Sequence, residues 1–416
     1  MKKIAVILIA LINIAVFYYG VWRIDYDIKM PGGLNEVVDK VTIESDTTLD
    51  FIISFYDKDE LVDEVTIQSN MYYEHNRKYH TDWIIKVKIK DTDELIHVDT
   101  YDLDGKRVLF EYGSDSIGDI LAWMPYIEEF TKKHNCISFV YCSEVTRPLF
   151  DKNHYKDINF ISSSYTNIYK RYPMEISWKE SKVLDGVDVF RTDYTRNPIN
   201  PFFIPEQKIG SDILGLDYEE KKPVLSFKTT KKNTKMFGKY VCISIQSSSQ
   251  AKYWNWIGGW DEVISYIKSE LKLSVICIDA ENIWGNGQVF NEIPEGAIDD
   301  TGYKPLKERA SMIYNSEFFI GIGSGLSWLA WAIGKPVIMI SSFSKPYTEF
   351  SCHRLYNDNP LSGYYNTGTY DRKNWNWNPI IKCNTKEDWH KMETITPGQV
   401  IQKVKSVWEG NNVKFI

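Results

Sequence analysis

The chain has 416 residues, of which 43% are hydrophobic and 25% are charged, a composition typical of folded globular proteins. At roughly 100–200 residues per domain, this length allows two to three domains. The net charge is -7, so no overall positive field attracts nucleic acid or anionic lipid, which argues against a nucleic-acid-binding function. Aromatic residues make up 14%, which suits a carbohydrate- or protein-binding surface as well as a core.

The cysteine and histidine pattern predicts neither disulfides nor a zinc site. The six cysteines are scattered and form no C-x-x-C motif, and the seven histidines do not cluster with carboxylates at ligand spacing. Cys242 and Cys277 lie in apolar runs typical of buried strands. We therefore expect a reducing compartment.

The N-terminus carries an uncharged stretch, residues 4–22, between Lys2-Lys3 and Arg23. Its length is just enough to cross a bilayer, which takes about 20 residues. Three interpretations compete. A membrane anchor is favoured, a cleaved signal peptide lacks a small-x-small cleavage site, and a buried structural segment is the third. We expect membrane association through residues 4–22, with a cytoplasmic protein as the alternative.

Residues 25–110 are predicted to form a small β-sandwich or barrel domain. Its β-rich stretches include residues 50–57 (DFIISFYD), 83–90 (WIIKVKIK) and 107–112 (RVLFEY), separated by polar turns. Asp104-Gly105 is a turn signal between two such strands.

Residues 111–235 are predicted to form a first α/β lobe. A loop leads into an amphipathic helix (GDILAWMPYIEEFTKKH), and the strand CISFVYC follows. This order favours a parallel sheet with right-handed crossovers. NFISSSY and VDVFRTDY are further predicted strands, and residues 197–235, rich in Pro, Lys and Thr, are expected to link two lobes.

Residues 236–416 are predicted to form a second α/β lobe. Strands are expected in KYVCISI, LSVICIDA, FFIGIG and PVIMISS, and helices in GWDEVISYIKSELK, KPLKERASMIYNSE and SGLSWLAWAIG. Gly334 and Pro336 are typical of a helix end followed by a strand. Two Rossmann-like lobes that face each other leave a cleft at the carboxyl ends of both sheets.

The first candidate for chemistry is Gly118-Asp119 in GSDSIGDILAW. The glycines allow a tight turn, and Asp119 begins a helix, where the dipole stabilises a carboxylate. Such a carboxylate can take a proton from an attacking hydroxyl as a general base. An ordinary helix-start aspartate is the competing interpretation, and Asp115 is the rival base.

The second candidate is FFIGIGSGLSWLAWA, in which a strand ends in a turn with Gly321, Gly323 and Gly325. Ser324 and Ser327 open the next helix, where free backbone N–H groups can bind phosphate. The spacing is not the dinucleotide fingerprint.

The third candidate is Lys252 in QSSSQAKYWNWIGGW, a polar loop after a strand. An ammonium there can neutralise a leaving diphosphate, although a lone loop lysine is more often solvated. Trp254 and Trp260 are expected either to pack or to stack on a base or sugar.

Taken together, GDILAWMPYIEEF, QSSSQAKYWN, DDTGYKPLKERA and FFIGIGSGLSWLAWA resemble the bacterial autotransporter heptosyltransferases over about residues 35–416. That family is related to the lipopolysaccharide heptosyltransferases. The resemblance implies a GT-B-type fold, two Rossmann-like lobes behind a small β-domain that helps to dock an acceptor protein. It also implies inverting, metal-independent transfer from ADP-heptose to Ser or Thr hydroxyls, which is protein O-glycosylation.

The resemblance also implies roles for individual residues. Asp119 corresponds to the catalytic base, and Lys252 to the lysine that contacts the donor phosphates. The remaining donor-binding positions are Thr301, Gly302, Ser324, Gly325, Leu326 and Ser327.

One departure from the family concerns its four iron-binding cysteines. The chain has other residues at those positions, and Cys352 and Cys383 lie elsewhere, which is too few thiolates for a tetrahedral site. We therefore expect no bound iron and no other cofactor, and assembly into an oligomer stays open. The residues at the family's cysteine positions are Leu361, Tyr364, Asn378-Pro379 and Lys391 or Met392.

Two other functions remain open at this stage. A transferase of the same fold that acts on a lipid or polysaccharide would suit a membrane anchor. A catalytically silent module that binds carbohydrate or nucleotide would keep the fold without turnover, but such a module has no need of Asp119, Lys252 and the GSGLS turn.

Overall fold

The computed structural model describes residues 40–43, 48–162, 168–184, 187–229, 232–248, 252–285, 290–357, 364–367 and 395–412. Within these ranges no helix is both long and apolar enough to cross a bilayer. The predicted membrane segment, residues 4–22, lies outside them and stays a prediction. The predicted boundaries between domains stay predictions as well.

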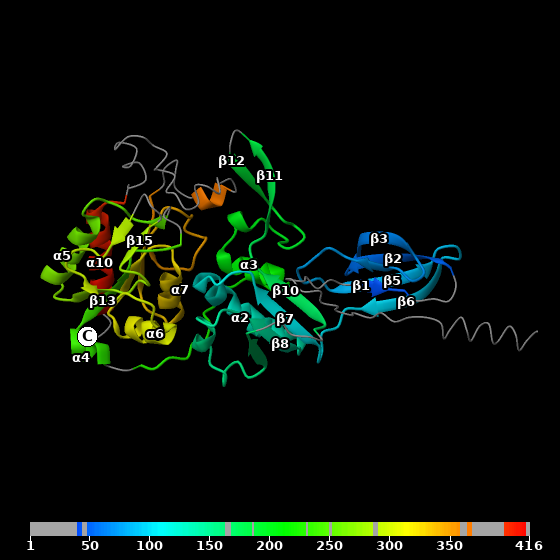
Figure 1. Ribbon diagram of the computed structural model, residues 1–416, viewed down its shortest axis with the longest axis horizontal. Helices are drawn as coiled ribbons and strands as arrows, with labels where there is room; N and C mark the ends of the chain where they lie inside the picture. The colour runs from blue at the N-terminus through cyan, green and yellow to red at the C-terminus, as the bar shows by residue number, and fades with distance from the viewer. Residues whose placement is uncertain are drawn as a thin grey trace, which may run out of the picture.

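The N-terminal part of the described chain is an antiparallel sheet (Figure 1). Side chains alternate along its β5, so that Trp83, Ile85, Val87 and Ile89 are buried on one face. A two-stranded sheet adds Val41 to the same apolar core. The four strands, in sheet order, are β3 (Glu60–Gln68), β2 (Asp50–Asp57), β5 (Trp83–Ile89) and β6 (Glu94–Thr100), and the two-stranded sheet joins β1 (Lys40–Thr42) to β4 (Tyr72–Glu74).

The strand RVLFEY belongs to a different sheet from the one predicted. It forms β7 (Arg107–Tyr112), which pairs in parallel with β8 (Ile137–Tyr141) and β10 (Lys170–Met174). Val108, Leu109 and Phe110 are all buried, as expected for a central strand covered on both faces. The Asp104-Gly105 turn exists, with Gly105 at φ +63°, but it connects two sheets and closes no hairpin.

The first parallel sheet has the order β10-β7-β8-β9, where β9 is Ile158–Ile161. The predicted amphipathic helix is α2 (Ile117–His134), which connects β7 to β8. Its N-cap is Ser116, and its C-cap Asn135 takes the left-handed conformation at φ 48°. The structure thus confirms the predicted strand–helix–strand unit.

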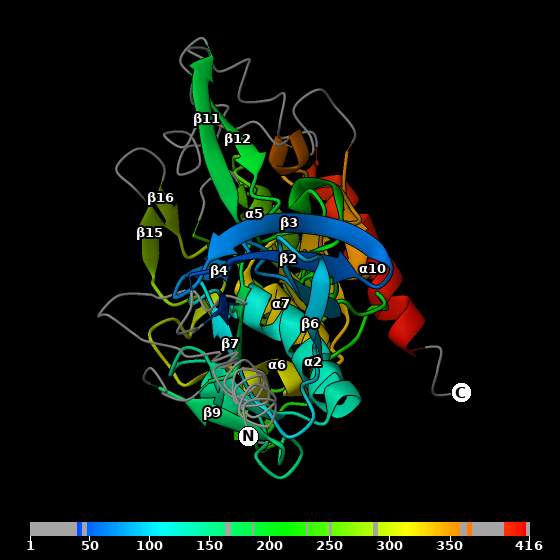
Figure 2. The ribbon, with the colours of Figure 1, turned by 90° about the vertical axis from the view of Figure 1, so that its right-hand side faces the viewer.

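VDVFRTDY is a strand, as predicted, but it does not belong to the parallel sheet. It forms β12 (Val187–Thr192), which pairs antiparallel with β11 (Trp178–Leu184). The pair extends away from both larger sheets (Figures 1 and 2). The expected linker, residues 197–235, contains η2 (Pro201–Phe203), α3 (Glu206–Ile213) and the start of α4 (Lys232–Phe237). The Pro-rich composition was interpreted as typical of a linker. Proline is also favoured at the start of a helix, so this composition is compatible with the short helices observed.

The second lobe has a six-stranded parallel sheet, and the predicted strands and helices are confirmed. Gly334, at φ +79°, follows the helix that it was expected to end. In sheet order the strands are β17 (Ile298–Asp299), β14 (Ser274–Cys277), β13 (Tyr240–Ser244), β18 (Phe319–Gly321), β19 (Val337–Ile340) and β20 (His353–Leu355). The helices are α5 (Gly259–Ser269), α6 (Leu306–Asn315), α7 (Gly325–Ala332) and α10 (Pro397–Asn412), with a hairpin of β15 (Ile283–Gly285) and β16 (Phe290–Glu292) and a turn η4 (Tyr364–Thr367).

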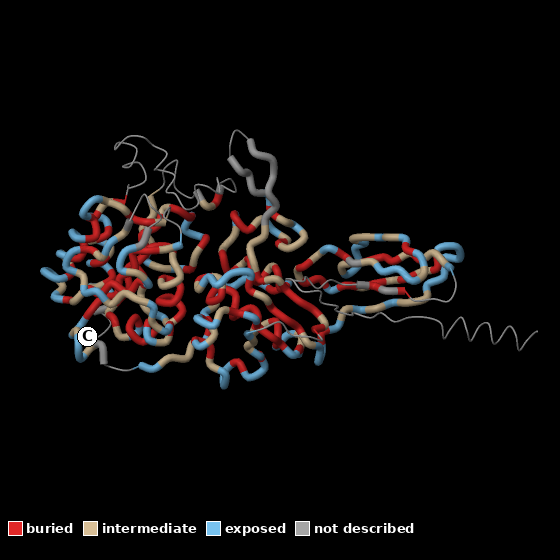
Figure 3. The backbone as a smooth tube through the Cα atoms, viewed as in Figure 1, coloured by how far each residue is buried: buried red, intermediate tan, exposed pale blue. Residues whose placement is uncertain are grey.

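The two lobes meet where α2 packs beside α7 (Figure 1). A Cβ on Gly118 would lie 2.9 Å from Cδ1 of Trp328, and a Cβ on Gly325 would lie 2.8 Å from Cβ of Ile117. Both glycines therefore serve the close approach of two helix starts. One apolar core continues from α2 through α7, and Figure 3 shows buried residues on both sides of this contact.

Candidate active site

Each parallel sheet has a point where the order in which the chain adds its strands reverses, from one side of a strand to the other. In the first sheet β7 lies between β8 and β10, and in the second β13 lies between β14 and β18. Loops that leave neighbouring strands at such a point diverge and open a crevice, where ligands bind in α/β sheets. The loops after β7, β10, β13 and β18 line one cleft of about 870 Å³.

Asp119 lies in this cleft, in the first turn of α2. Its carboxylate accepts hydrogen bonds from Ser116 Oγ at 2.8 Å and from Ser114 Oγ at 3.1 Å. Burial raises the pKa of Asp119 above its ordinary value, while the two serines and the Lys252 ammonium act in the opposite direction. A raised pKa suits a general base, which is most effective when its pKa approaches the working pH.

Ser116 offers a test of this pKa balance. Its hydroxyl stabilises the ionised form of Asp119, so Ser116→Ala is expected to raise the pKa of that carboxyl further. Because the base works deprotonated, the acid limb of the kcat/KM profile should move to higher pH, with near-normal activity above it. A pH–rate profile measures this shift.

Thr396→Ala is the matched control for loss of a helix cap. Thr396 accepts a hydrogen bond from the Gln399 backbone N–H at the start of α10, which is not part of the cleft. Both substitutions should cost about 1 kcal/mol of stability, but only Ser116→Ala should move the acid limb. An unmoved limb in Ser116→Ala would contradict the hydrogen bond's role.

The glycine-rich turn after β18 forms the opposite wall. Gly323, Ser324, Gly325 and Leu326 line the cleft, and Ser324 is the N-cap of α7 without a side-chain capping bond. The first N–H groups of a helix generally lack partners within the helix, and they favour a negative group. Ser327 is buried instead, where its hydroxyl donates to the Ile322 carbonyl at 2.6 Å.

Lys252 also lines the cleft, on the loop after β13. Its ammonium lies 5.9 Å from the ring centroid of Phe343. The positive charge of this ammonium lowers the pKa of Asp119. The structure thus brings together three predicted groups, namely a carboxylate from one lobe and an ammonium and a helix start from the other.

Four other predicted positions do not line the cleft. Trp254 and Trp260 contact each other edge-on in the core of the second lobe, which settles their role as packing. Thr301 donates to Asp299, and the Gly302 carbonyl accepts from Arg309 at 2.8 Å. These two residues precede Tyr303, which does line the cleft and is 86% exposed.

Five carboxylates of the cleft were missed, namely Glu175, Glu206, Asp279, Glu281 and Glu349. Asp279 follows the buried strand β14 and accepts from Ser244 Oγ at 2.6 Å and from the Ile245 N–H at 2.8 Å. Its place after an apolar strand was a usable signal. Glu206 and Glu349 come from segments without a recognisable pattern.

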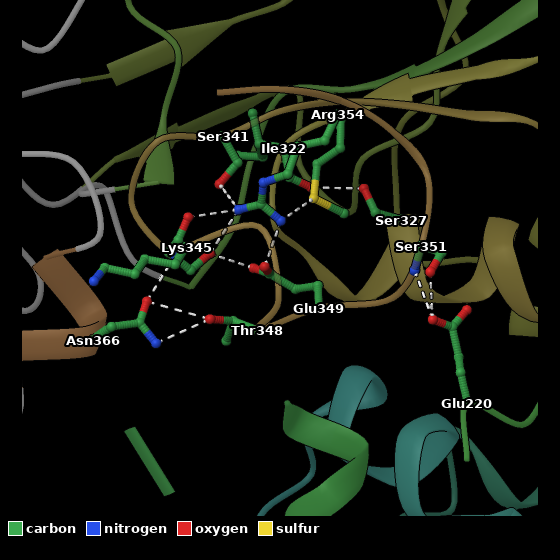
Figure 4. A network of polar contacts seen from close by, with 12 residues as sticks. Glu220, Ile322, Ser327, Ser341, Lys345, Thr348, Glu349, Ser351, Arg354 and Asn366 are labelled. Carbon is green, nitrogen blue, oxygen red and sulfur yellow. Dashed lines mark hydrogen bonds and ion pairs between the residues drawn. The ribbon is translucent and has the colours of Figure 1, made fainter. Parts of the chain in front are cut away.

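Glu349 is held by an internal ion pair (Figure 4). Arg354 Nη1 lies 2.6 Å from Glu349 Oε2, and Ser344 Oγ donates to Oε1 at 2.6 Å. The same guanidinium donates to the Ser344 carbonyl and to Ser341 Oγ. Both charges are largely buried. Removal of one partner would therefore leave an unpaired charge in a buried place, which is strongly destabilising. The ion pair therefore fixes the loop between β19 and β20 against the cleft.

Two Rossmann-like lobes with one cleft between their crossover points form the GT-B architecture, so the fold and site define a glycosyltransferase. Residues 160–349 match the family model of glycosyltransferase family 9 (heptosyltransferase). The chain is 35% identical over 335 residues to the autotransporter heptosyltransferase Aah of Escherichia coli, which is 80% of this chain and 82% of that one. The chain belongs to the autotransporter heptosyltransferases.

Two solved structures of TibC from E. coli support this placement. The first, an iron-containing dodecameric glycosyltransferase from strain H10407, has a TM-score of 0.79 and 29% identity and covers 92% of this chain and 100% of that chain. The second, in complex with ADP-D-beta-D-heptose, has a TM-score of 0.77 and 29% identity, and covers 87% of this chain and 92% of that chain.

The prediction that the chain holds no iron is contradicted by this likeness to an iron-containing enzyme. The prediction rested on a count of thiolates, but imidazole also binds iron. Leu361, Asn378, Lys391 and Cys383 lie outside the described residues. In the described ranges no group of three or more His, Cys, Asp or Glu side chains is placed to hold a metal ion, so we derive no catalytic step through iron.

Proposed function

We propose that this protein transfers a heptose from ADP-heptose to a Ser or Thr hydroxyl of an acceptor protein, with inversion at the anomeric carbon. One observation carries the proposal: Asp119 and Lys252 line the same cleft as the helix start at Ser324. The likeness to Aah and to TibC, whose solved complex contains ADP-D-beta-D-heptose, supports heptose and ADP-heptose in particular.

In the proposed reaction Asp119 accepts the proton of the acceptor hydroxyl. The hydroxyl oxygen bonds to the anomeric carbon while the bond from that carbon to the diphosphate oxygen breaks. Lys252 and the N–H groups that begin α7 stabilise the negative charge that stays on the diphosphate. Since protein groups can supply this positive charge, we propose that transfer needs no added divalent cation.

A donor panel tests the function. The full-length protein is incubated with ADP-heptose and with other nucleotide sugars, together with a Ser- and Thr-containing acceptor protein. Mass spectrometry should detect released ADP and an acceptor heavier by one heptose, at a rate unchanged by added Mg²⁺. Release of a different nucleotide, or transfer only to a lipid or polysaccharide acceptor, would contradict the proposal.

Oligomeric assembly is a second part of the proposal. The TibC structures are of a dodecamer, and their likeness to this chain supports a comparable assembly. Light scattering on the purified protein should then give a mass several times that of the chain.

A further inference from the structure

Glu206 is a buried carboxyl group at the start of α3, in the wall of the cleft. Only 9% of its surface is exposed. Among the described residues its Oε1 atom, which is fully buried, has no hydrogen-bond partner. A buried acceptor without a partner is costly, and its persistence points to a partner that arrives from outside the chain.

Residues of both lobes hold the backbone of Glu206 by hydrogen bonds. Its N–H donates to the Thr348 carbonyl at 2.8 Å, and its carbonyl accepts from Trp123 Nε1 at 2.7 Å. Thr348 in turn contacts Asn366 (Figure 4). The backbone of Glu206 is therefore fixed by contacts with α2 and with the loop that carries Glu349.

The surroundings of Glu206 favour a neutral carboxyl group. Burial first, and then the negative charges of Asp119 and Glu349, raise its pKa well above the ordinary value, and Lys252 opposes this only in part. The two neighbouring carboxylates already have partners, because Ser116 donates to Asp119 and Arg354 pairs with Glu349. Glu206 is thus left to interact with a ligand.

We propose that Glu206 binds the transferred sugar, donating one hydrogen bond to a sugar hydroxyl and accepting another, and so helps to determine which sugar is transferred. The inference rests on the proposed function. A neutral carboxyl group carries one donor and one acceptor, as a hydroxyl does, so the two groups are complementary. A site that pairs a buried polar group with a substrate hydroxyl rejects an analogue without that hydroxyl.

The experiment compares Glu206→Gln, Glu206→Ala and the wild type in the full-length protein. Each is assayed with ADP-heptose and with a set of donors in which one heptose hydroxyl at a time is replaced by hydrogen. An amide keeps a donor and an acceptor, so Glu206→Gln should stay within about fivefold of wild-type kcat/KM. Glu206→Ala should lose about 10- to 100-fold with ADP-heptose.

The decisive result is that Glu206→Ala loses the wild-type preference for ADP-heptose over one of the deoxy donors. For one deoxy donor, Glu206→Ala and the wild type should have the same kcat/KM, because the partner hydroxyl is already missing. Glu262→Gln is the matched control, since Glu262 lies in the first turn of α5, is exposed and does not line the cleft.

The following outcomes would overturn the role of Glu206 or the function on which it rests. A Glu206→Gln enzyme as impaired as Glu206→Ala, with an altered pH profile, would indicate proton transfer. Equal losses of Glu206→Ala with every donor would indicate a structural role. Wild-type protein that turns over no nucleotide sugar would contradict the proposed function itself, whereas wild-type turnover with unchanged discrimination in Glu206→Ala would contradict only the role of Glu206.

Discussion

Asp119→Asn is expected to reduce transfer by ~10²–10⁴-fold, the usual cost of losing a general base. The amide keeps the shape of the side chain but only one of the two oxygens that accept from Ser114 and Ser116. It cannot accept a proton from the acceptor hydroxyl. Asp119→Ala should be at least as impaired. Donor affinity should stay close to wild type in both variants, because the base acts on the acceptor. Steady-state kinetics and calorimetric titration with the donor measure the two quantities.

Asp115 provides the comparison, since it lines the same cleft and was the rival candidate. Asp115 is exposed, and it lacks the two serine hydrogen bonds that hold Asp119 in place. We expect Asp115→Asn to keep most of the activity. Wild-type turnover in Asp119→Asn, or a severe loss in Asp115→Asn alone, would remove the assignment of the base.

Lys252→Ala is expected to weaken donor binding and to slow transfer together. The loss in kcat should be ~10²–10³-fold, as when one group that stabilises developing negative charge is removed. A second effect concerns pH. The ammonium lowers the pKa of Asp119, so its removal should raise that pKa and move the acid limb of the rate profile to higher pH.

Donor titrations and pH–rate profiles separate these effects. Lys268→Ala is the control, because Lys268 belongs to the same lobe but donates to the Gly296 carbonyl away from the cleft. Unchanged donor affinity in Lys252→Ala would contradict contact with the phosphates. An unmoved acid limb would contradict its influence on Asp119.

Much of this protein follows from local sequence patterns. The helix from Ile117, the strands of the second lobe and the turn at Gly323 were predicted because apolar periodicity and helix caps depend on neighbours in the chain. Lys252 was predicted as a cleft residue because it follows a strand predicted in a parallel sheet. Asp119 was predicted because it begins a helix after a glycine-containing turn. The family resemblance was confirmed as well.

Only the tertiary structure decided the remaining features. RVLFEY pairs with strands of the first lobe, and Trp254 packs in a core, because pairing partners and burial depend on residues far apart in the chain. Glu206 has no local signal of function. It enters the cleft because Trp123 and Thr348, from opposite lobes, bind its backbone, and no pattern within its own segment encodes those two contacts.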